Sequence, residues 1–331
     1  MCNGALQKCP CYIDLQPYGI EASGCIFDTQ WTKRVKIAYN SGVHSSAYEN
    51  EKEYLTLVFE KSHGQHGIIE GGVLVDKKTG EQKMVYSKRP KKEGESLFEE
   101  AITQIVISNS LIRGGFIEGT PEVYRIFGLK CGGVGFLMRP VDGVVMEEML
   151  HSFSVVPAKF VIEALFHIAA MIDWLVEDLG MNHRDLKPSN LLILFHKKMY
   201  KKRKIGNKKH TICSDFEIVF LDYGFSCIKN EISLGGIYGS DDPCVKEGRD
   251  LFMFLAFLYL EFHHKLENGI HILFEKWLTV GFCNMLRNRG KELDPVDYIY
   301  FMSGNSEIKK FICTPTKVID DLQKFVNLSE K

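Results

Sequence analysis

HRDLKPSN, at His183–Asn190, is the stretch on which the interpretation of this 331-residue sequence depends. A second short stretch, DYG at Asp222–Gly224, follows it further along the chain. Apolar residues recur at helical spacing from Pro157 to Leu179, directly before the first stretch, and predict a long, half-buried helix. Pro157 suits the first turn of that helix, and Gly180 suits its C-terminal cap.

The side chains of these two stretches match what phosphoryl transfer from ATP demands, which is mainly positioning and charge neutralisation. Asp185 can orient the attacking hydroxyl and accept its proton, and Lys187 can meet the charge on the moving phosphoryl group. Mg²⁺ prefers oxygen ligands and keeps most of its waters, so Asn190 and Asp222 are the candidate metal ligands. Strand-like runs at 191–194 and 217–221 should bring these two residues back together.

The stretch 183–190 resembles the catalytic loop of eukaryotic-type protein kinases, and DYG resembles their Asp-Phe-Gly metal motif. The resemblance implies ATP and Mg²⁺ as cofactors, with Asp185 as catalytic base, Lys187 on the γ-phosphate, and Asn190 and Asp222 on the metal. A lysine at position 187 is the form seen in serine/threonine kinases. We therefore expect a serine/threonine protein kinase acting on protein substrates; the alternative is a pseudokinase or scaffold without turnover.

Further stretches resemble the protein kinases of large nucleocytoplasmic DNA viruses. They are the helix stretch Glu100–Gln104 together with Thr120–Phe127, Asp222–Cys227 and Pro243–Asp250. The fold implied is α+β and bilobal, with a β-rich N-lobe and a helical C-lobe. The expected division is an N-terminal extension of unknown role over residues 1–50, an N-lobe over 51–138 and a C-lobe over 139–331.

The N-lobe of such a kinase needs a glycine loop, a strand lysine and a helix glutamate, and two registers supply them. In the favoured register Gly64, Gly67 and Ile69 belong to the loop, Lys88 is the strand lysine and Glu100 the helix glutamate. That register gives a role to the helix predicted at 96–112, where Ser96 and Glu99 form a capping-box pattern.

The second register places the loop at 19–26, the lysine at Lys36 and the glutamate at Glu51. It looks more typical locally, but it leaves the predicted helix at 96–112 without a role. Strands are expected at 73–76, 83–87, 122–127 and 134–138 in either case. By resemblance, Met138 lies at the back of the adenine pocket and Val141 faces the adenine edge.

The segment between Asp222 and Arg249 is short for a kinase activation segment and lacks the usual Ala-Pro-Glu anchor. By resemblance, Asp250 is the buried aspartate that ties the catalytic loop to the next helix. Arg184 would pair with a phosphate in this segment, because guanidinium suits bidentate contact. The candidate phosphate carriers are Ser226, Ser233, Tyr238 and Ser240. Because the segment is short, constitutive activity or control by a partner is at least as well supported.

The composition is that of an ordinary globular protein, with 45% apolar and 25% charged residues and a net charge of −1. The first residues lack a signal-peptide pattern, and no apolar run is long enough to cross a membrane. We therefore expect a cytoplasmic protein, in the host cell if viral, with the nucleus as the alternative. Reduced thiols are the simpler expectation for the ten cysteines, although a metal site at Cys2, Cys9 and Cys11 is conceivable.

The run Lys197–Lys209 holds eight lysines and arginines in thirteen positions, between the two motifs. It is expected to form an enlarged hairpin. The simplest explanation of its positive charge is that the hairpin is a loop exposed to solvent. Docking of an acidic partner or nucleic acid is the functional alternative, and a nuclear localisation signal is the third.

Overall fold

The computed structural model describes residues 45–49, 52–63, 67–92, 94–128, 133–229, 232–234, 242, 244–267, 269–288 and 294–329. These residues form two compact units. The first comprises the chain up to Val106 together with Pro121–Asp142, and the second comprises Ile107–Thr120 together with Gly143–Lys331.

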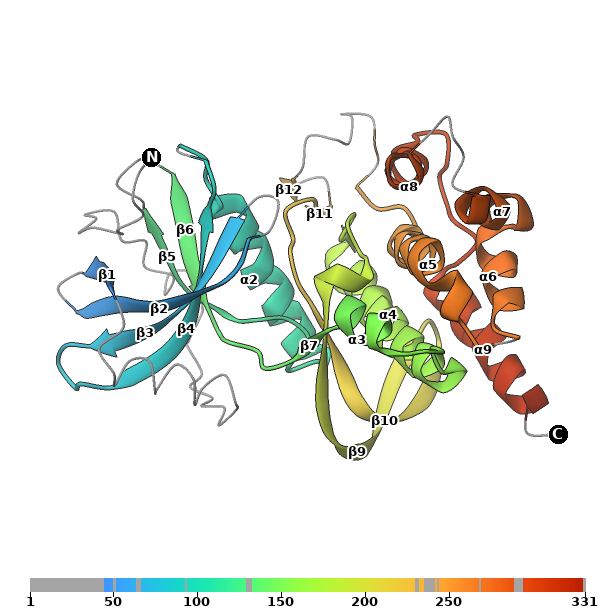
Figure 1. The fold of residues 1–331 in the computed structure, drawn as a ribbon, viewed down its shortest axis with the longest axis horizontal. Helices are drawn as coiled ribbons and strands as arrows, with labels where there is room; N and C mark the ends of the chain where they lie inside the picture. Colours follow the sequence, from blue (N-terminus) through green and yellow to red (C-terminus); the bar gives the residue numbers. More distant parts are fainter. Residues whose placement is uncertain are drawn as a thin grey trace. The chain divides into compact units, whose positions relative to one another are not determined.

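The first unit is built on a six-stranded antiparallel sheet with the order β1-β2-β3-β4-β6-β5 among the described residues (Figure 1). Its strands are β1 Ser45–Glu49, β2 Glu53–His63, β3 Gly67–Asp76, β4 Gln82–Pro90, β5 Val123–Gly128 and β6 Val134–Met138. Helix α2, Phe98–Arg113, follows β4. The strands predicted at 73–76, 83–87, 122–127 and 134–138 are all present, and the predicted helix begins two residues after Ser96, whose Oγ accepts a hydrogen bond from the Phe98 N–H.

Apolar residues on both faces of this sheet are buried, as the two-residue period of a strand requires. Val73 and Val75 pack in one cluster with residues of α2 such as Ala101 and Ile105, while Leu74 between them packs in a second cluster with Val85. The β3–β4 turn is fixed by Asp76, whose carboxylate accepts hydrogen bonds from the backbone N–H groups of the next turn residues. Because both faces of β3 are apolar and buried, the turn at Asp76 rather than a polar face sets the register of β3 against β4.

The second unit is mainly helical. Its helices are α3 Met146–Ser152, α4 Ala158–Leu179, α5 Arg249–Phe262, α6 His271–Leu278, α7 Val280–Asn288, α8 Pro295–Gly304 and α9 Pro315–Ser329, with 3₁₀ turns at Pro188–Asn190 and His263–Lys265. Short strands lie at β7 Val144–Val145, β8 Met181–Asn182, β11 Cys227–Ile228 and β12 Ile232–Ser233. A β-rich unit followed by a helix-rich unit confirms the predicted α+β class. None of the helices described is long and apolar enough to cross a membrane.

Helix α4 carries the chain into the catalytic-loop stretch, as predicted. Gly180 ends it in the left-handed conformation, at φ 58°, and its N–H donates to the Val176 carbonyl. This is the backbone geometry that favours glycine at a helix C-terminus. Helix α5 is buried on nearly all sides, which explains why its sequence is a continuous apolar run rather than a stripe.

The two short strands predicted at 191–194 and 217–221 are the inner ends of one long hairpin. Strand β9, Leu191–Ile205, pairs antiparallel with β10, Lys208–Phe220, through a two-residue turn at Gly206 and Asn207 (Figure 1). Gly206 has φ 57°, which suits a tight hairpin turn. The basic run lies on the outer half of this hairpin, as expected.

His167 supplies a test of the packing of α4. It is 4% exposed, and burial lowers the pKa of its imidazole from 6.5 to about 4. Below pH 6.5 the unfolded chain binds a proton that the folded chain does not, so stability falls as pH falls from 6.5 towards 4. Between pH 7 and pH 5 this residue should cost about 2 kcal/mol of unfolding free energy.

Urea unfolding of the wild type and His167→Leu at both pH values measures that slope. The variant should lose less stability at pH 5 than the wild type, and a matched change at the exposed His264 should leave the slope unaltered. Equal slopes for the wild type and His167→Leu would contradict the assignment.

Candidate active site

Asp250, at the start of α5, holds the catalytic-loop stretch in place. Its carboxylate accepts hydrogen bonds from the backbone N–H groups of His183, at 3.0 Å, and Arg184, at 2.9 Å. The same carboxylate accepts from Asn182 Nδ2 at 3.1 Å. Arg184 has φ 65°, a left-handed conformation that costs energy for a non-glycine residue and persists where the surroundings over-determine it. The contact expected of Asp250 from the family resemblance is therefore present.

The catalytic-loop side chains converge on Asp185, which is 3% exposed. Lys187 Nζ donates to Asp185 Oδ1 at 3.0 Å, and Asn190 Nδ2 donates to Asp185 Oδ2 at 2.8 Å. The Tyr300 hydroxyl, on α8, also donates to Asp185 Oδ1. Asn190 donates here through its amide nitrogen, and among the described residues none donates to its amide oxygen, which is the atom available to a ligand.

The DYG stretch lies beside this loop. The Leu221 N–H donates to the Asn190 carbonyl at 3.0 Å, and His183 Nε2 lies 3.0 Å from the Leu221 carbonyl. Asp222 follows with φ 60°, again left-handed. Tyr223 is fully buried against the His183 ring, at 5.1 Å between centroids, and burial raises the pKa of its phenol. Tyr223 is thus packed in the interior, and its hydroxyl donates to the Phe220 carbonyl at 3.3 Å.

In the first unit, the lysine and glutamate of the favoured register form a buried ion pair. Lys88 Nζ on β4 lies 2.5 Å from Glu100 Oε1 on α2, and the two residues are 8% and 6% exposed. Ile69 is the cross-strand partner of Lys88. A Cβ added at Gly67 would lie 3.1 Å from Lys88 Cε, so a larger residue there would crowd the lysine. Gly64, Lys36 and Glu51 lie outside the described residues.

The two residues expected at the adenine also lie in the first unit. Met138, at the end of β6, is 7% exposed, and its sulfur lies 3.8 Å from Gln104 Nε2 on α2. Val141 is 5% exposed. Gln104 also donates to the Pro121 carbonyl at 2.7 Å, which ties α2 to the entry of β5. Gln104 was singled out in the sequence by the resemblance of its helix, without a role.

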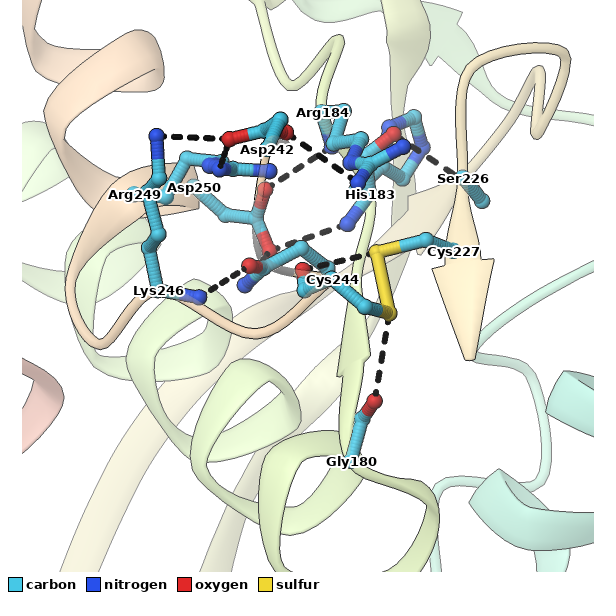
Figure 2. Close-up of a disulfide and its surroundings, with 11 residues drawn as sticks. Gly180, His183, Arg184, Ser226, Cys227, Asp242, Cys244, Lys246, Arg249 and Asp250 are labelled. Atoms are coloured by element: carbon cyan, nitrogen blue, oxygen red, sulfur yellow. Dashed lines mark hydrogen bonds and ion pairs between the residues drawn. A yellow bond between two sulfur atoms is a disulfide. The ribbon is translucent and has the colours of Figure 1, made fainter. Parts of the chain in front are cut away.

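Arg184 pairs with a carboxylate of its own chain. Its guanidinium lies 3.1 Å from Asp242, which also contacts Lys246 Nζ at 2.6 Å and an Arg249 guanidinium nitrogen at 2.5 Å (Figure 2). These four side chains are at most 2% exposed. We call them the Asp242 cluster. Within it, the Asp242 carboxylate takes the place of the phosphate that the Arg184 guanidinium was expected to bind.

Of the four candidate phosphate carriers in this segment, the structure describes the side chain of Ser226. Ser226 is fully buried and its hydroxyl donates to the His183 carbonyl at 3.3 Å, so phosphate could not be added there without opening the loop. Tyr238 and Ser240 lie outside the described residues, and so does the side chain of Ser233.

Cys227 and Cys244 form a disulfide, which corrects the expectation that all ten cysteines are reduced (Figure 2). Strand β11 pairs with β8 and places Cys227 beside the catalytic loop, while Cys244 lies between Asp242 and Lys246. The Cα atoms are 5.5 Å apart, a separation that a disulfide spans without backbone movement. The expectation failed because cysteine spacing in a long chain does not reveal which residues the fold brings together.

The basic run is partly neutralised within the chain. Lys204 lies 3.0 Å from Glu177 on α4, Lys208 lies 2.8 Å from Asp320 on α9, and Lys201 pairs with Glu217. The Arg203 guanidinium stacks 4.3 Å from the Phe116 ring centroid. Docking of an acidic partner or nucleic acid therefore stays a prediction for the remaining exposed lysines: Lys197, Lys198, Lys202 and Lys209.

Searches with the sequence found neither a matching protein-family model nor a matching curated protein. Similar solved structures include a Plasmodium kinase domain, at 12% identity and TM-score 0.43. The alignment covers 82% of this chain and 94% of that domain. The kinase domain of Mycobacterium tuberculosis PknI, in a mutant form, is 14% identical with TM-score 0.45, covering 82% and 95%. The element order and the motif geometry described above define a protein-kinase-like fold.

The Asp242 cluster predicts a large stability effect. Asp242→Asn would leave three buried cations without their carboxylate, and breaking a buried charge group in this way costs about 3–5 kcal/mol. Thermal or urea unfolding should show this loss. Asp320→Asn is the matched control, because it breaks the exposed pair with Lys208 and should cost less than about 1 kcal/mol. Similar losses for the two variants would show that the cluster is not the stabilising unit described.

The disulfide predicts two measurable properties. Alkylation of the denatured, unreduced protein should leave Cys227 and Cys244 unmodified and joined in one peptide pair by mass spectrometry. Because the cystine links residues 17 positions apart, reduction should lower the unfolding free energy by about 3 kcal/mol. Cys213 is a free cysteine and serves as the internal control for complete alkylation. Alkylation of both residues without reductant would contradict the assignment.

Proposed function

We propose that this protein is a serine/threonine protein kinase that transfers the γ-phosphoryl group of ATP to hydroxyls of other proteins. The observation that carries the proposal is the convergence of Lys187 and Asn190 on the buried carboxylate of Asp185. Phosphoryl transfer needs a positioned base, a cation and oxygen ligands for a metal, and these residues supply them in one loop.

Each residue has a definite task in the proposed reaction. Asp185 orients the substrate hydroxyl and accepts its proton as the phosphoryl group departs from ATP. Lys187 neutralises charge on the transferred group. Lys88, fixed by Glu100, binds the ATP phosphates, while Met138 and Val141 contact the adenine. The lysine at 187 favours serine or threonine as the acceptor.

Asn190 and Asp222 are the residues that would hold Mg²⁺. The donor chemistry fits, because one offers an amide oxygen and the other a carboxylate, both hard ligands that this ion accepts while it keeps its waters. The backbone hydrogen bond from Leu221 to Asn190 keeps the two adjacent in the chain fold. When bound, the ion would neutralise phosphate charge.

The alternative proposal is a pseudokinase or scaffold without turnover. The atypical glycine loop favours it, since Gly64 and Gly67 are accompanied by no third family glycine. The buried Lys88–Glu100 pair and the hydrogen bonds of Lys187 and Asn190 to Asp185 support the enzyme instead, because burying charged groups costs free energy and a scaffold without turnover does not require it.

We further propose that the enzyme needs no phosphate on its activation segment. The Asp242 carboxylate already supplies a negative partner for Arg184. Activity should then survive treatment with a phosphatase.

A radiolabelled-ATP assay with Mg²⁺ and generic protein substrates tests the function. The wild type should transfer phosphate to serine and threonine. Asp185→Ala should lower turnover about a thousandfold, because the base is lost, while nucleotide binding persists. Lys88→Met should lower kcat/KM at least about a hundredfold, and Lys36→Met should behave as the wild type.

Each alternative has its own outcome in this assay. Loss of activity in Lys36→Met with an active Lys88→Met would show that the second register is right. A folded wild type that binds ATP without transferring phosphate would show the pseudokinase.

A further inference from the structure

Tyr300 contacts the proposed catalytic base although it is remote in sequence from both motifs. Its hydroxyl donates to Asp185 Oδ1, and Lys187 Nζ donates to the same hydroxyl at 3.2 Å. The Tyr300 hydroxyl therefore donates its proton to the Asp185 carboxylate and accepts a hydrogen bond from the Lys187 ammonium through a lone pair. Such a bridge links two groups that the proposed reaction requires in fixed positions.

The ring of Tyr300 is held as well as its hydroxyl. It meets Phe257 of α5 edge-on at 5.7 Å between centroids, and Phe225, just after DYG, lies at 6.4 Å. The Lys187 ammonium lies 5.8 Å from the Phe257 ring centroid and 5.9 Å from that of Tyr300. Edge-to-face packing and cation–π attraction both restrict the ring. The hydroxyl is thus aimed at Asp185 by packing on two sides.

Helix α8, which carries Tyr300, is anchored at both ends. Asp294 caps its N-terminus by accepting from the Val296 N–H at 2.8 Å. At the other end the buried Lys246 donates to the carbonyls of Ser303, at 3.1 Å, and Asn305, at 2.9 Å. Lys246 belongs to the Asp242 cluster, so the C-terminal end of α8 is tied to the residue that pairs with Arg184 of the catalytic loop.

The carboxylate of Asp185 still has room for a substrate. Its two oxygens offer about four lone-pair positions in all. Among the described residues, Oδ1 accepts from Lys187 and Tyr300, whereas Oδ2 accepts from the Asn190 side chain. The free position on Oδ2 is the one available to an acceptor hydroxyl. Tyr300 therefore completes the coordination of Oδ1 and leaves Oδ2 for the reaction.

We propose that Tyr300 is a positioning residue for the catalytic base: its hydroxyl holds the Asp185 carboxylate, and through it Lys187, in the orientation required for phosphoryl transfer. This inference rests on the proposed kinase function. It assigns a part of the active site to α8, an element outside both sequence motifs.

Tyr300→Phe is the decisive variant, because it removes the hydroxyl and keeps the ring that packs against Phe257. Turnover, kcat, should fall about tenfold, the loss expected for one hydrogen bond to a charged group, while KM for ATP stays unchanged. Tyr298→Phe is the matched control on the same helix; its ring stacks on Phe282 and Phe301, and it should match the wild type. Both variants should remain folded, with Tyr300→Phe melting at most a few degrees below the wild type because it lacks one hydrogen bond.

Two outcomes would overturn the inference. Unchanged kcat in Tyr300→Phe would show that the hydroxyl has no part in the reaction. Increased kcat would show that the hydroxyl instead occupies the place of the substrate and inhibits the enzyme.

A second readout separates this inference from the proposed function. The ¹³Cγ resonance of Asp185, assigned by its absence in Asp185→Asn, should shift in Tyr300→Phe and stay in place in Tyr298→Phe. If the wild type transfers no phosphate, the kinase proposal and the positioning role fall together, even where this resonance shows that the hydrogen bond exists. If the wild type is active and the resonance does not move, the contact itself is disproved and the kinase proposal stands.

Discussion

The carboxylate of Asp250 is the constraint on which the geometry of the second unit depends. A buried carboxylate is tolerated only when donors surround it, and the donors here are the backbone of His183 and Arg184 and the side chain of Asn182. In satisfying Asp250, the chain is bent into the left-handed turn at Arg184. That turn sends Arg184 towards Asp242 and leaves Asp185, the next residue, among Lys187, Asn190 and Tyr300.

A second buried carboxylate, that of Asp242, holds the same stretch of chain as Asp250 does. Asp242 meets Arg184, Lys246 and Arg249, so three cations share one carboxylate in an interior position. Such an arrangement is sensitive to loss of any member, because each remaining charge would be left poorly compensated. The stretch 183–190 is consequently fixed by two carboxylates, Asp250 on its backbone and Asp242 on its arginine side chain. The disulfide between Cys227 and Cys244 closes a covalent loop of the chain, and Asp242 lies within that loop.

Much of this could be read from the sequence, and the reasons are physical. Local patterns determine local structure: the apolar period of 157–179 specified α4, and the short apolar run at 134–138 specified β6. The spacing of HRDLKPSN identified Asp185, Lys187 and Asn190 because neighbours in a loop stay neighbours in space. The pairing of Lys88 with Glu100 was predicted from the element order that a protein-kinase N-lobe requires.

Contacts between distant segments could not be predicted in this way. Nothing in the sequence around Tyr300 distinguishes it from Tyr298, and only the packing of α8 against α5 selects one of them. The sequence likewise did not pair Cys244 with Cys227 or Asp242 with Arg184, and only the fold brings these residues together. The sequence predicted an enlarged hairpin at the basic run but not how far its strands extend, because the charged, exposed residues there lack the apolar alternation by which strands are recognised. The anchoring of α8 also bears on where the functional domain ends. A chain truncated before Asp294 would keep both sequence motifs intact, yet the buried ammonium of Lys246 would lose two carbonyl acceptors and the carboxylate of Asp185 one of its donors.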